Sequence, residues 1–112
     1  MGSRAARVLR GPRQLATTPG TVRYRDVHYV YVLRSAKDGK LYTGYTADLR
    51  QRVADHVAGR ASSTHDRRPM ELIYYEAYLL AADAKAREIF LKSGPGKRFI
   101  RKQLRYYFSS LK

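Results

Sequence analysis

Apolar and polar positions follow different periods along this chain, and each change of period marks a predicted element. Residues 29–33 are rich in aromatic and β-branched side chains, which is typical of a largely buried strand. Residues 36–39 read Ala-Lys-Asp-Gly and have the chemistry of a hairpin turn, because glycine tolerates positive φ. Residues 41–45 return as a second strand. The pattern therefore predicts a β-hairpin.

A helical period follows the hairpin. Apolar residues recur at every fourth position of a predicted helix over 47–58, namely Leu49, Val53 and Val57. Thr46 is the expected N-cap of this helix, and Gly59 stands just past its end. The polar residues 60–69 are expected to form a loop.

A third strand over 71–78 and two further helices complete the pattern. Residues 81–92 are rich in alanine and lack glycine and proline, which favours a helix. Ser93-Gly94-Pro95-Gly96 is expected to break it, and a last helix is expected over 97–109. One side of that helix carries Ile100, Leu104, Tyr107 and Phe108. The order ββαβαα predicts an α+β fold, with a small, predominantly antiparallel three-stranded sheet flanked by helices.

The chain has 112 residues, which suits one domain, expected over 26–112. Residues 1–25 are interrupted by proline and glycine and show no sustained period, so we expect a disordered arm. This arm carries six arginines and no acidic residue. A transit peptide and a fusion remnant at Met1-Gly2-Ser3 are the alternatives.

The charge is strongly one-sided. Lys and Arg total 23 against 9 Asp and Glu, a net charge of +14, which suits a polyanionic partner such as nucleic acid. A well-solvated surface and a ribosome-associated protein are the alternatives. The chain has no cysteine, which fits a reducing compartment such as the cytoplasm. It has no apolar run long enough to span a membrane, so we expect a soluble protein.

Two tyrosine motifs lie in the predicted hairpin, Tyr29-Val30-Tyr31 and Tyr42-Thr43-Gly44, with a spacing of 11 from Tyr31 to Tyr42. Four polar residues follow in a fixed order, Arg52, His56, His65 and Glu88, at intervals of 4, 9 and 23. This ordered set resembles the active site of the GIY-YIG nuclease family. The segment 91–98 also resembles the endings of small standalone bacterial members.

The resemblance runs from about Tyr29 to Leu104 and has three departures. Tyr29 stands where the family name has glycine, and Thr43 stands where it has isoleucine. Gln103 is a weak stand-in for an asparagine that some members use near the C-terminus. The tyrosines and Gly44 are the members of the motifs that the family requires.

The resemblance implies that Tyr31 helps to deprotonate the attacking water and that Tyr42 hydrogen-bonds beside it. A phenol has a reference pKa near ~10, so it acts as a base only with the help of a cation or a metal-bound water. Packing in an aromatic core is the alternative for both residues, since the chain has ten tyrosines.

Arg52 and His56 are four residues apart and share one helical face. Arg52 can donate two N–H groups to a scissile phosphate, and His56 can donate to the phosphate or the leaving oxygen. The resemblance also gives His65 a catalytic or substrate-contacting role. A solvated arginine, a partly buried histidine and an exposed DNA contact are the respective alternatives.

The resemblance implies that Glu88 is the ligand of a single divalent ion, Mg²⁺ or Mn²⁺, because a hard carboxylate oxygen suits such an ion. The alternative is an exposed helical glutamate paired with Lys85 or Lys92. No acidic residue follows Glu88, and a basic C-terminal surface is expected to contact phosphates. Its members are Lys92, Lys97, Arg98, Arg101, Lys102 and Arg105.

These features predict a metal-dependent endonuclease that hydrolyses DNA phosphodiesters, with a structure-selective role in repair or recombination resting on family analogy. One alternative is a catalytically weak or inactive nucleic-acid-binding module with the same fold. A second is an RNA-binding accessory protein. We expect a monomer that contacts DNA rather than RNA, makes no membrane contact and uses a protein partner for targeting.

Overall fold

The computed structural model describes residues 26–112, and the predicted arm lies outside the described residues. Three strands, β1 (His28–Ser35), β2 (Leu41–Thr46) and β3 (Met70–Tyr78), form one sheet in the order β2-β1-β3. Both pairings are antiparallel. The predicted three-stranded sheet is therefore confirmed, with β1 as its central strand.

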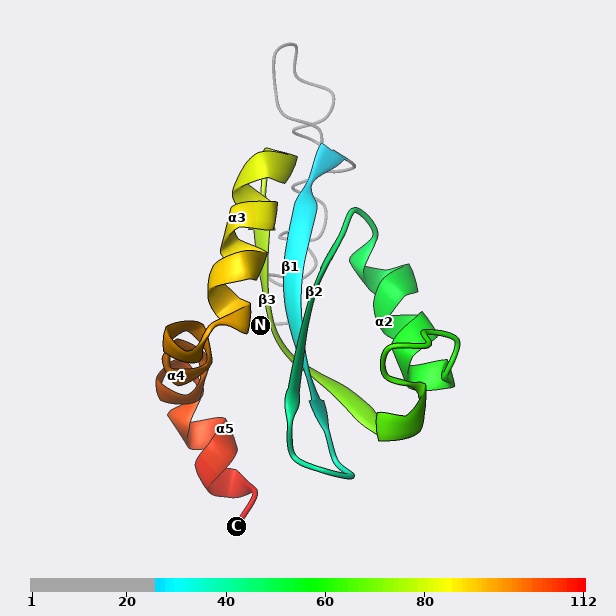
Figure 1. Cartoon of the computed structure of the whole chain (residues 1–112), viewed down its shortest axis with the longest axis vertical. Coiled ribbons are helices and arrows are strands. Elements are labelled where there is room, and N and C mark those ends of the chain that lie inside the picture. Colours follow the sequence, from blue (N-terminus) through cyan, green and yellow to red (C-terminus); the bar gives the residue numbers. More distant parts are fainter. Residues whose placement is uncertain (1–25) are drawn as a thin grey trace, which may run out of the picture.

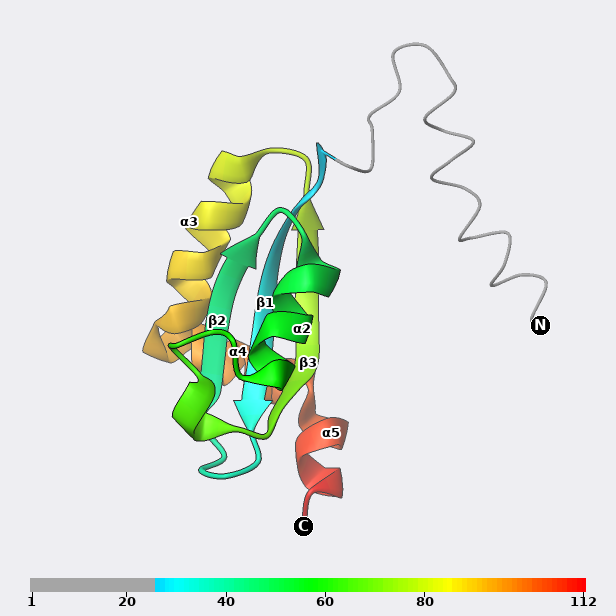
Figure 2. The same ribbon diagram turned by 90° about the vertical axis from the view of Figure 1, so that its right-hand side faces the viewer.

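Helices cover both faces of this sheet (Figures 1 and 2). Helix α2 (Leu49–Ala58) lies on one face, whereas α3 (Ala81–Lys92) lies along the other. Helices α4 (Gly94–Gln103) and α5 (Arg105–Ser110) continue from α3, and a short 3-10 turn, η2 (His65–Arg67), precedes β3. None of the helices within 26–112 is both long and apolar enough to cross a membrane.

The central strand divides the core into two layers. Val30 and Val32 point to the α3 face and pack with Leu91 and Ile100, whereas Tyr31 and Leu33 belong to the α2 face. Successive residues of a strand point to opposite faces, so a strand covered on both sides is buried along its length. Residues 30–33 are accordingly all buried.

Two expectations for the first helix are wrong. Asp48, not Thr46, caps α2 by accepting the backbone N–H of Gln51, because β2 extends to Thr46. Val57 is 56% exposed, since the last turn of α2 directs His56 rather than Val57 into the core. Gly59 ends the helix in the left-handed region, with φ of 85°, as expected.

The C-terminal helices also depart from the prediction. The chain bends only at Ser93, and residues 94–96 form the first turn of α4. Pro95 is tolerated in that turn because its missing N–H has no intrahelical partner there. A second interruption at Leu104 separates α4 from α5, so the predicted single helix is two. Beyond it, Tyr107 donates to Glu71 at the start of β3.

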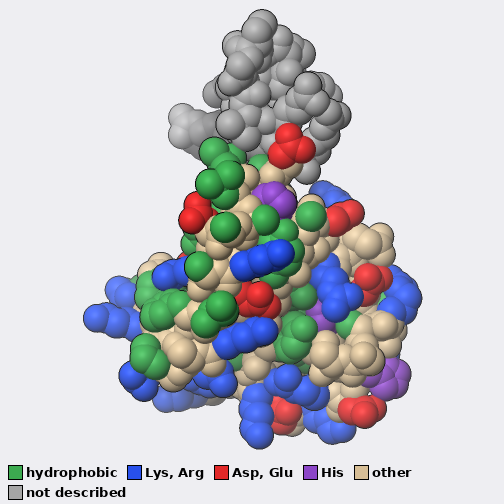
Figure 3. Space-filling view, turned by 45° about the horizontal axis from the view of Figure 1, so that its top comes forward, with side chains coloured by type: hydrophobic (Ala, Val, Ile, Leu, Met, Phe, Trp, Pro, Cys, Tyr) green, Lys and Arg blue, Asp and Glu red, His purple; other side chains and the backbone are tan. Residues whose placement is uncertain are grey.

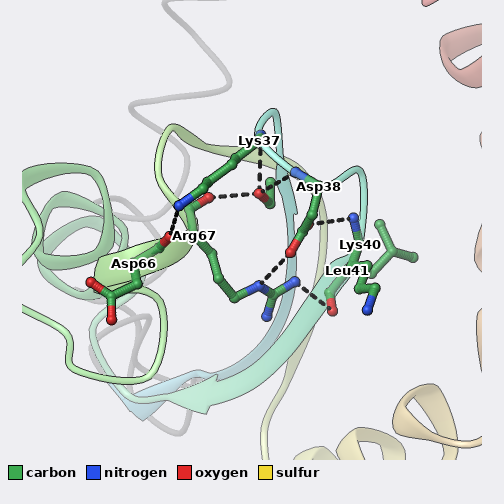
Figure 4. Close-up of polar contacts among 7 residues, drawn as sticks. Lys37, Asp38, Lys40, Leu41, Asp66 and Arg67 are labelled. Carbon is green, nitrogen blue, oxygen red and sulfur yellow. Dashed lines mark hydrogen bonds and ion pairs between the residues drawn. The ribbon is translucent and has the colours of Figure 1, made fainter.

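The hairpin turn is tied to the loop that precedes β3 (Figure 4). Buried Ser35 donates to the backbone carbonyl of Arg67 at 2.6 Å and accepts the N–H groups of Lys37 and Asp38. Lys37 Nζ donates to the carbonyl of Asp66 at 2.9 Å. The loop, expected to be irregular, is therefore held against the end of β1.

Candidate functional site

Tyr31 lies at the centre of the α2 face and directly opposite Gly44 in the β1–β2 register. A Cβ atom at Gly44 would overlap the hydroxyl group and ring of Tyr31, so this close approach requires glycine. Tyr31 is only 1% exposed. The second motif thus supplies the space in which the tyrosine of the first motif lies.

A line of buried hydrogen bonds runs from Tyr31 through His56 to Thr64. The Tyr31 hydroxyl is 2.9 Å from His56 Nε2, and His56 Nδ1 is 2.6 Å from Thr64 Oγ1. All three side chains are almost fully buried. A neutral imidazole has one donor and one acceptor nitrogen, so His56 donates one of these two bonds and accepts the other.

Tyr42 joins this group from the neighbouring strand. Its ring centroid lies 5.1 Å from that of His56 and 6.4 Å from that of Tyr31. Unlike Tyr31, Tyr42 is half-buried and lines a cavity of about 190 Å³ with Thr43, Lys92 and Lys97. The two motif tyrosines therefore differ in their access to solvent.

Electrostatics couples Tyr31 to Arg52. Burial raises the pKa of Tyr31 above its ordinary value of 10.0, the Arg52 guanidinium beside its hydroxyl opposes that rise, and the negative charge of Glu88 adds to it. The pKa of Arg52 is raised, chiefly because its guanidinium lies beside the Tyr31 hydroxyl. Tyr31 is therefore a neutral phenol at neutral pH, with a cation placed to stabilise its phenolate.

His56 is neutral for a related reason. Its burial, and then the charge of Arg52, lower its pKa below the ordinary 6.5. An uncharged imidazole can accept a proton at Nε2 while it donates from Nδ1. The pair Tyr31–His56 can therefore pass a proton between its two members at neutral pH.

Glu88 approaches the site from α3, on the other face of the sheet. Its side chain is 21% exposed and forms an ion pair with Lys92, with Oε2 and Nζ 3.1 Å apart. Lys92 lines the same cavity as Tyr42. The predicted i,i+4 pair is thus present, and it lies beside the tyrosine cluster rather than on a remote surface.

The described residues offer few protein ligands to a divalent ion. Among residues 26–112, no three or more His, Cys, Asp or Glu side chains are grouped to hold a metal. Mg²⁺ retains most of its waters and is commonly held by one or two carboxylates together with substrate phosphates. The single carboxylate of Glu88 fits that pattern. Its negative charge is paired with Lys92 in this structure.

His65 stands apart from this cluster. It is exposed on η2, its Nδ1 lies 2.9 Å from the carbonyl oxygen of Gly59, and its Nε2 lies 3.9 Å from Asp66. It lines a separate open cavity of about 530 Å³ with Lys37 and Val57. The structure therefore does not bring His65 to Tyr31 and His56 as the other motif residues are brought.

The predicted basic surface divides into two parts. Lys92, Lys97 and Arg101 line cavities beside β2, whereas Arg98, Lys102 and Arg105 are exposed elsewhere on α4 and α5. Figure 3 shows Lys and Arg side chains spread over the lower half of one face, with few acidic side chains among them. The basic character is therefore a property of the folded surface.

Sequence reasoning missed Thr64. A threonine in a Ser/Thr-rich loop carries no motif signal, and its partner His56 is eight residues earlier. Its full burial depends on how residues 60–69 fold back onto α2, which no local pattern encodes. The loop's own place is fixed by the buried contacts of Ser35.

Comparison with known proteins adds the remaining information. The family model described as the GIY-YIG catalytic domain matches residues 27–99. A UPF0213 protein of Staphylococcus epidermidis is 44% identical over 69 residues, covering 61% of this chain and 83% of that protein. A UPF0213 protein of Bacillus pumilus is 43% identical over 72 residues, covering 63% and 72%.

A solved structure was also found. The solution NMR structure of a UPF0213 protein from Bacillus halodurans is 34% identical and superposes with a TM-score of 0.45, covering 70% of this chain and 85% of that one.

Proposed function

This chain belongs to the GIY-YIG family, and from that premise we propose that it is a metal-dependent endonuclease that hydrolyses DNA phosphodiester bonds. The observation that carries the proposal is the buried line Tyr31–His56–Thr64, with Arg52 beside the Tyr31 hydroxyl. A tyrosine that served only to fill the core would need one hydrogen-bond partner for its hydroxyl group, but not a guanidinium beside it as well.

The first role in this proposal is proton transfer. Tyr31 accepts a proton from the attacking water while its own proton passes to His56 Nε2, 2.9 Å away. Arg52 stabilises negative charge on the phenolic oxygen during this transfer. Thr64 would act as a positioning residue, because a bond that it accepts from Nδ1 leaves Nε2 as the acceptor for the Tyr31 proton.

The second role belongs to Arg52. Tyr31 is almost fully enclosed, and the Arg52 guanidinium lies against its hydroxyl. A phosphate is a stronger partner for a guanidinium than a neutral phenol, and it accepts two N–H bonds at once. Because a guanidinium has five N–H groups, Arg52 would bind the scissile phosphate with two of them while it stays beside the Tyr31 hydroxyl. Tyr42, which lines the cavity, would form a hydrogen bond beside Tyr31.

Glu88 would hold the divalent ion, Mg²⁺ or Mn²⁺. When bound, such an ion supplies stabilisation of the charge that develops on the phosphate and the leaving oxygen. In its absence Lys92 compensates the carboxylate at 3.1 Å. His65 is assigned a substrate contact rather than a catalytic role, because it lies outside the cluster.

We propose DNA rather than RNA as substrate, and a structure-selective role in repair or recombination, by analogy with the family. No sequence-reading module is recognisable in the described part, so targeting would depend on DNA structure or on a protein partner. The specific alternative is a nucleic-acid-binding module with little catalysis. The Glu88–Lys92 ion pair favours this alternative, because the carboxylate that would bind the metal is already paired with a lysine.

The experiment is incubation of the purified protein with Mg²⁺ or Mn²⁺ and a panel of plasmid, flap, fork, single-stranded and RNA substrates. Metal-dependent cleavage of DNA is the expected result. Binding of DNA without cleavage of any member of the panel would favour the binding module, and preference for RNA at matched salt would favour the RNA-binding alternative.

A first prediction concerns the metal ligand. Glu88→Ala should abolish metal-dependent cleavage and leave the fold and nucleic-acid binding intact, because Glu88 belongs to neither core cluster and has one ion-pair partner. Cleavage rates, circular dichroism and DNA affinity are measured together. Asp83→Ala on the same helix is the matched control, and cleavage by Glu88→Ala at the wild-type rate would remove Glu88 from the site.

A further inference from the structure

Two cavities beside β2 join into one groove. The cavity of about 190 Å³ that contains Tyr42 is lined by Leu41 and Lys97, and both residues also line a neighbouring cavity of about 410 Å³. We call the combined feature the β2 groove. Its lining residues are Lys40, Leu41, Tyr42, Thr43, Arg67, Lys92, Lys97 and Arg101. One end of the groove therefore lies at the candidate active site.

The groove is lined by five basic side chains and no acidic one. Two of the five have acidic partners, Lys92 with Glu88 and Arg67 with Asp38. Among the described residues, the ion pairs include none that involves Lys40, Lys97 or Arg101. Three cations thus share one concave surface without compensation, which is unfavourable unless an anion binds there.

Helix α4 supplies two of these three cations from one face. Lys97 and Arg101 are four residues apart, so their side chains lie one turn above the other. The Arg101 guanidinium carbon lies 5.0 Å from the centre of the Phe108 ring on α5, a cation–π contact. The bend at Leu104 that separates α4 from α5 therefore also places a ring beneath Arg101 and limits its motion.

The opposite wall is equally well ordered (Figure 4). Arg67 reaches from the loop before β3 toward the hairpin, with its Nε 3.4 Å from Asp38 and an N–H group 3.5 Å from the Leu41 carbonyl. The N–H of Lys40 donates to Asp38 at 2.9 Å. The backbone bond to Lys40 and the charge of Arg67 lower the pKa of Asp38, so it stays ionised and keeps Arg67 in place.

We propose that the β2 groove binds the sugar-phosphate backbone of one nucleic-acid strand, leading from the active site at Tyr42 past Lys97 to Arg101 and Lys40. This inference rests on the proposed function, and it deepens it by assigning the path of the substrate. Successive phosphates of a strand present charges in a row, which matches cations at the two walls of a groove better than a single small anion does.

The test compares two double variants that remove equal charge from the same helix. Lys97→Ala/Arg101→Ala removes the two cations that α4 contributes to the groove. Arg98→Ala/Lys102→Ala removes two exposed cations that line neither cavity. Binding of labelled DNA is measured by fluorescence anisotropy over a salt series, in EDTA so that no cleavage occurs. Circular dichroism and thermal unfolding check that both variants fold.

The groove variant should weaken binding about tenfold or more at low salt. Its log–log salt slope should be smaller by up to about 1.8 on duplex DNA or about 1.4 on a single strand, two phosphate contacts in each case. The control variant should lose less affinity and change the slope less than the groove variant, because Arg98 and Lys102 line neither cavity. As the oligonucleotide is lengthened, the affinity of the groove variant should level off at a shorter length than the affinity of the wild type.

Equal losses in the two variants would overturn the proposal, because they would mean that general charge rather than the groove attracts the strand. An unchanged slope in the groove variant would overturn it as well. A wild-type protein that shows the predicted groove dependence but cleaves nothing with metal would instead refute the nuclease proposal alone, so the two failures are distinguishable.

Discussion

Tyr31 differs from Tyr74 and Tyr78 of the same sheet in what surrounds its hydroxyl group. Tyr74 and Tyr78 donate to Glu76, which also accepts two N–H bonds from Arg87. Burial, and then the bond to Glu76, raises the pKa of Tyr74 to about 12. Tyr31 instead meets a neutral base and a cation. The Arg52 guanidinium opposes the rise that burial causes in the pKa of Tyr31, whereas the Glu76 carboxylate adds to the rise in the pKa of Tyr74.

The second prediction follows from this environment. Tyr31→Phe removes one oxygen and keeps the packing of the ring, so the chemical step should slow by about 10²–10⁴-fold, the usual contribution of a positioned proton-transfer group. Substrate affinity should change little, because Arg52 remains. Single-turnover cleavage and DNA affinity are the measurements.

Tyr74→Phe is the control, since it also deletes a hydroxyl group from a tyrosine of the sheet, in this case a half-buried one that donates to Glu76. It should affect stability and not the rate of cleavage. If Tyr31→Phe loses stability and activity in proportion, or keeps full turnover, the tyrosine is a core residue and the proton relay is wrong.

The sequence anticipated the members of this site unevenly. The order and spacing of Tyr31, Tyr42, Arg52 and His56 predicted one constellation, and the structure brings these four side chains together. Thr64 was missed because a buried threonine carries no signal in a loop sequence. His65, whose spacing matched the motif, faces another cavity because η2 turns its ring toward the end of α2.

At the scale of elements, the pairing of β1 with β2 positions the site. Tyr31 and Gly44 face each other across the ladder, and the missing side chain of Gly44 leaves room for the Tyr31 ring. The glycine of the second motif is thus explained by packing against the tyrosine of the first. It does not need a direct contact with substrate.

The third prediction tests this packing. Gly44→Ala should displace the Tyr31 hydroxyl from His56, lower the free energy of unfolding by about 1–3 kcal/mol as overpacked cores do, and abolish cleavage. Gly94→Ala is the matched control, because its new methyl group would meet Arg98 at an ordinary distance of 3.5 Å. Urea unfolding and cleavage rates separate the two. Wild-type behaviour of Gly44→Ala would show that Tyr31 has room to move.

Elements with a strong local signal were predicted, and boundaries fixed by tertiary contacts were not. The strands and the helix over 81–92 follow the pattern of apolar residues closely. The start of α2 was misplaced because both Thr46 and Asp48 are good caps, and strand pairing decided between them. The bend at Leu104 was not predicted, because no glycine or proline marks it in the sequence.

At the scale of the whole molecule, charge is divided between the described domain and the residues before it. Residues 26–112 carry 17 basic and 9 acidic side chains, a net charge of +8, and residues 1–25 carry +6. The domain is therefore basic without its N-terminal residues. Each proposed catalytic residue lies within the segment 27–99 that matches the family.

The last prediction concerns those N-terminal residues. Deletion of residues 1–25 should weaken DNA binding and flatten its salt dependence, yet spare single-turnover cleavage at saturating protein. Each arginine that neutralises a phosphate adds about 0.9 to the log–log slope on duplex DNA, so six arginines set a ceiling of ~5 on the change. Transient contacts would give a smaller value than this ceiling.

A variant with the six arginines replaced by glutamine is the control, because it keeps the length of the chain and removes only the charge. Both changes should flatten the slope equally if charge is responsible. An unchanged slope after deletion would mean that these residues make no phosphate contacts, as expected of a transit segment. Loss of cleavage at saturating protein would place them within the active structure and move the domain boundary from 26 toward the N-terminus.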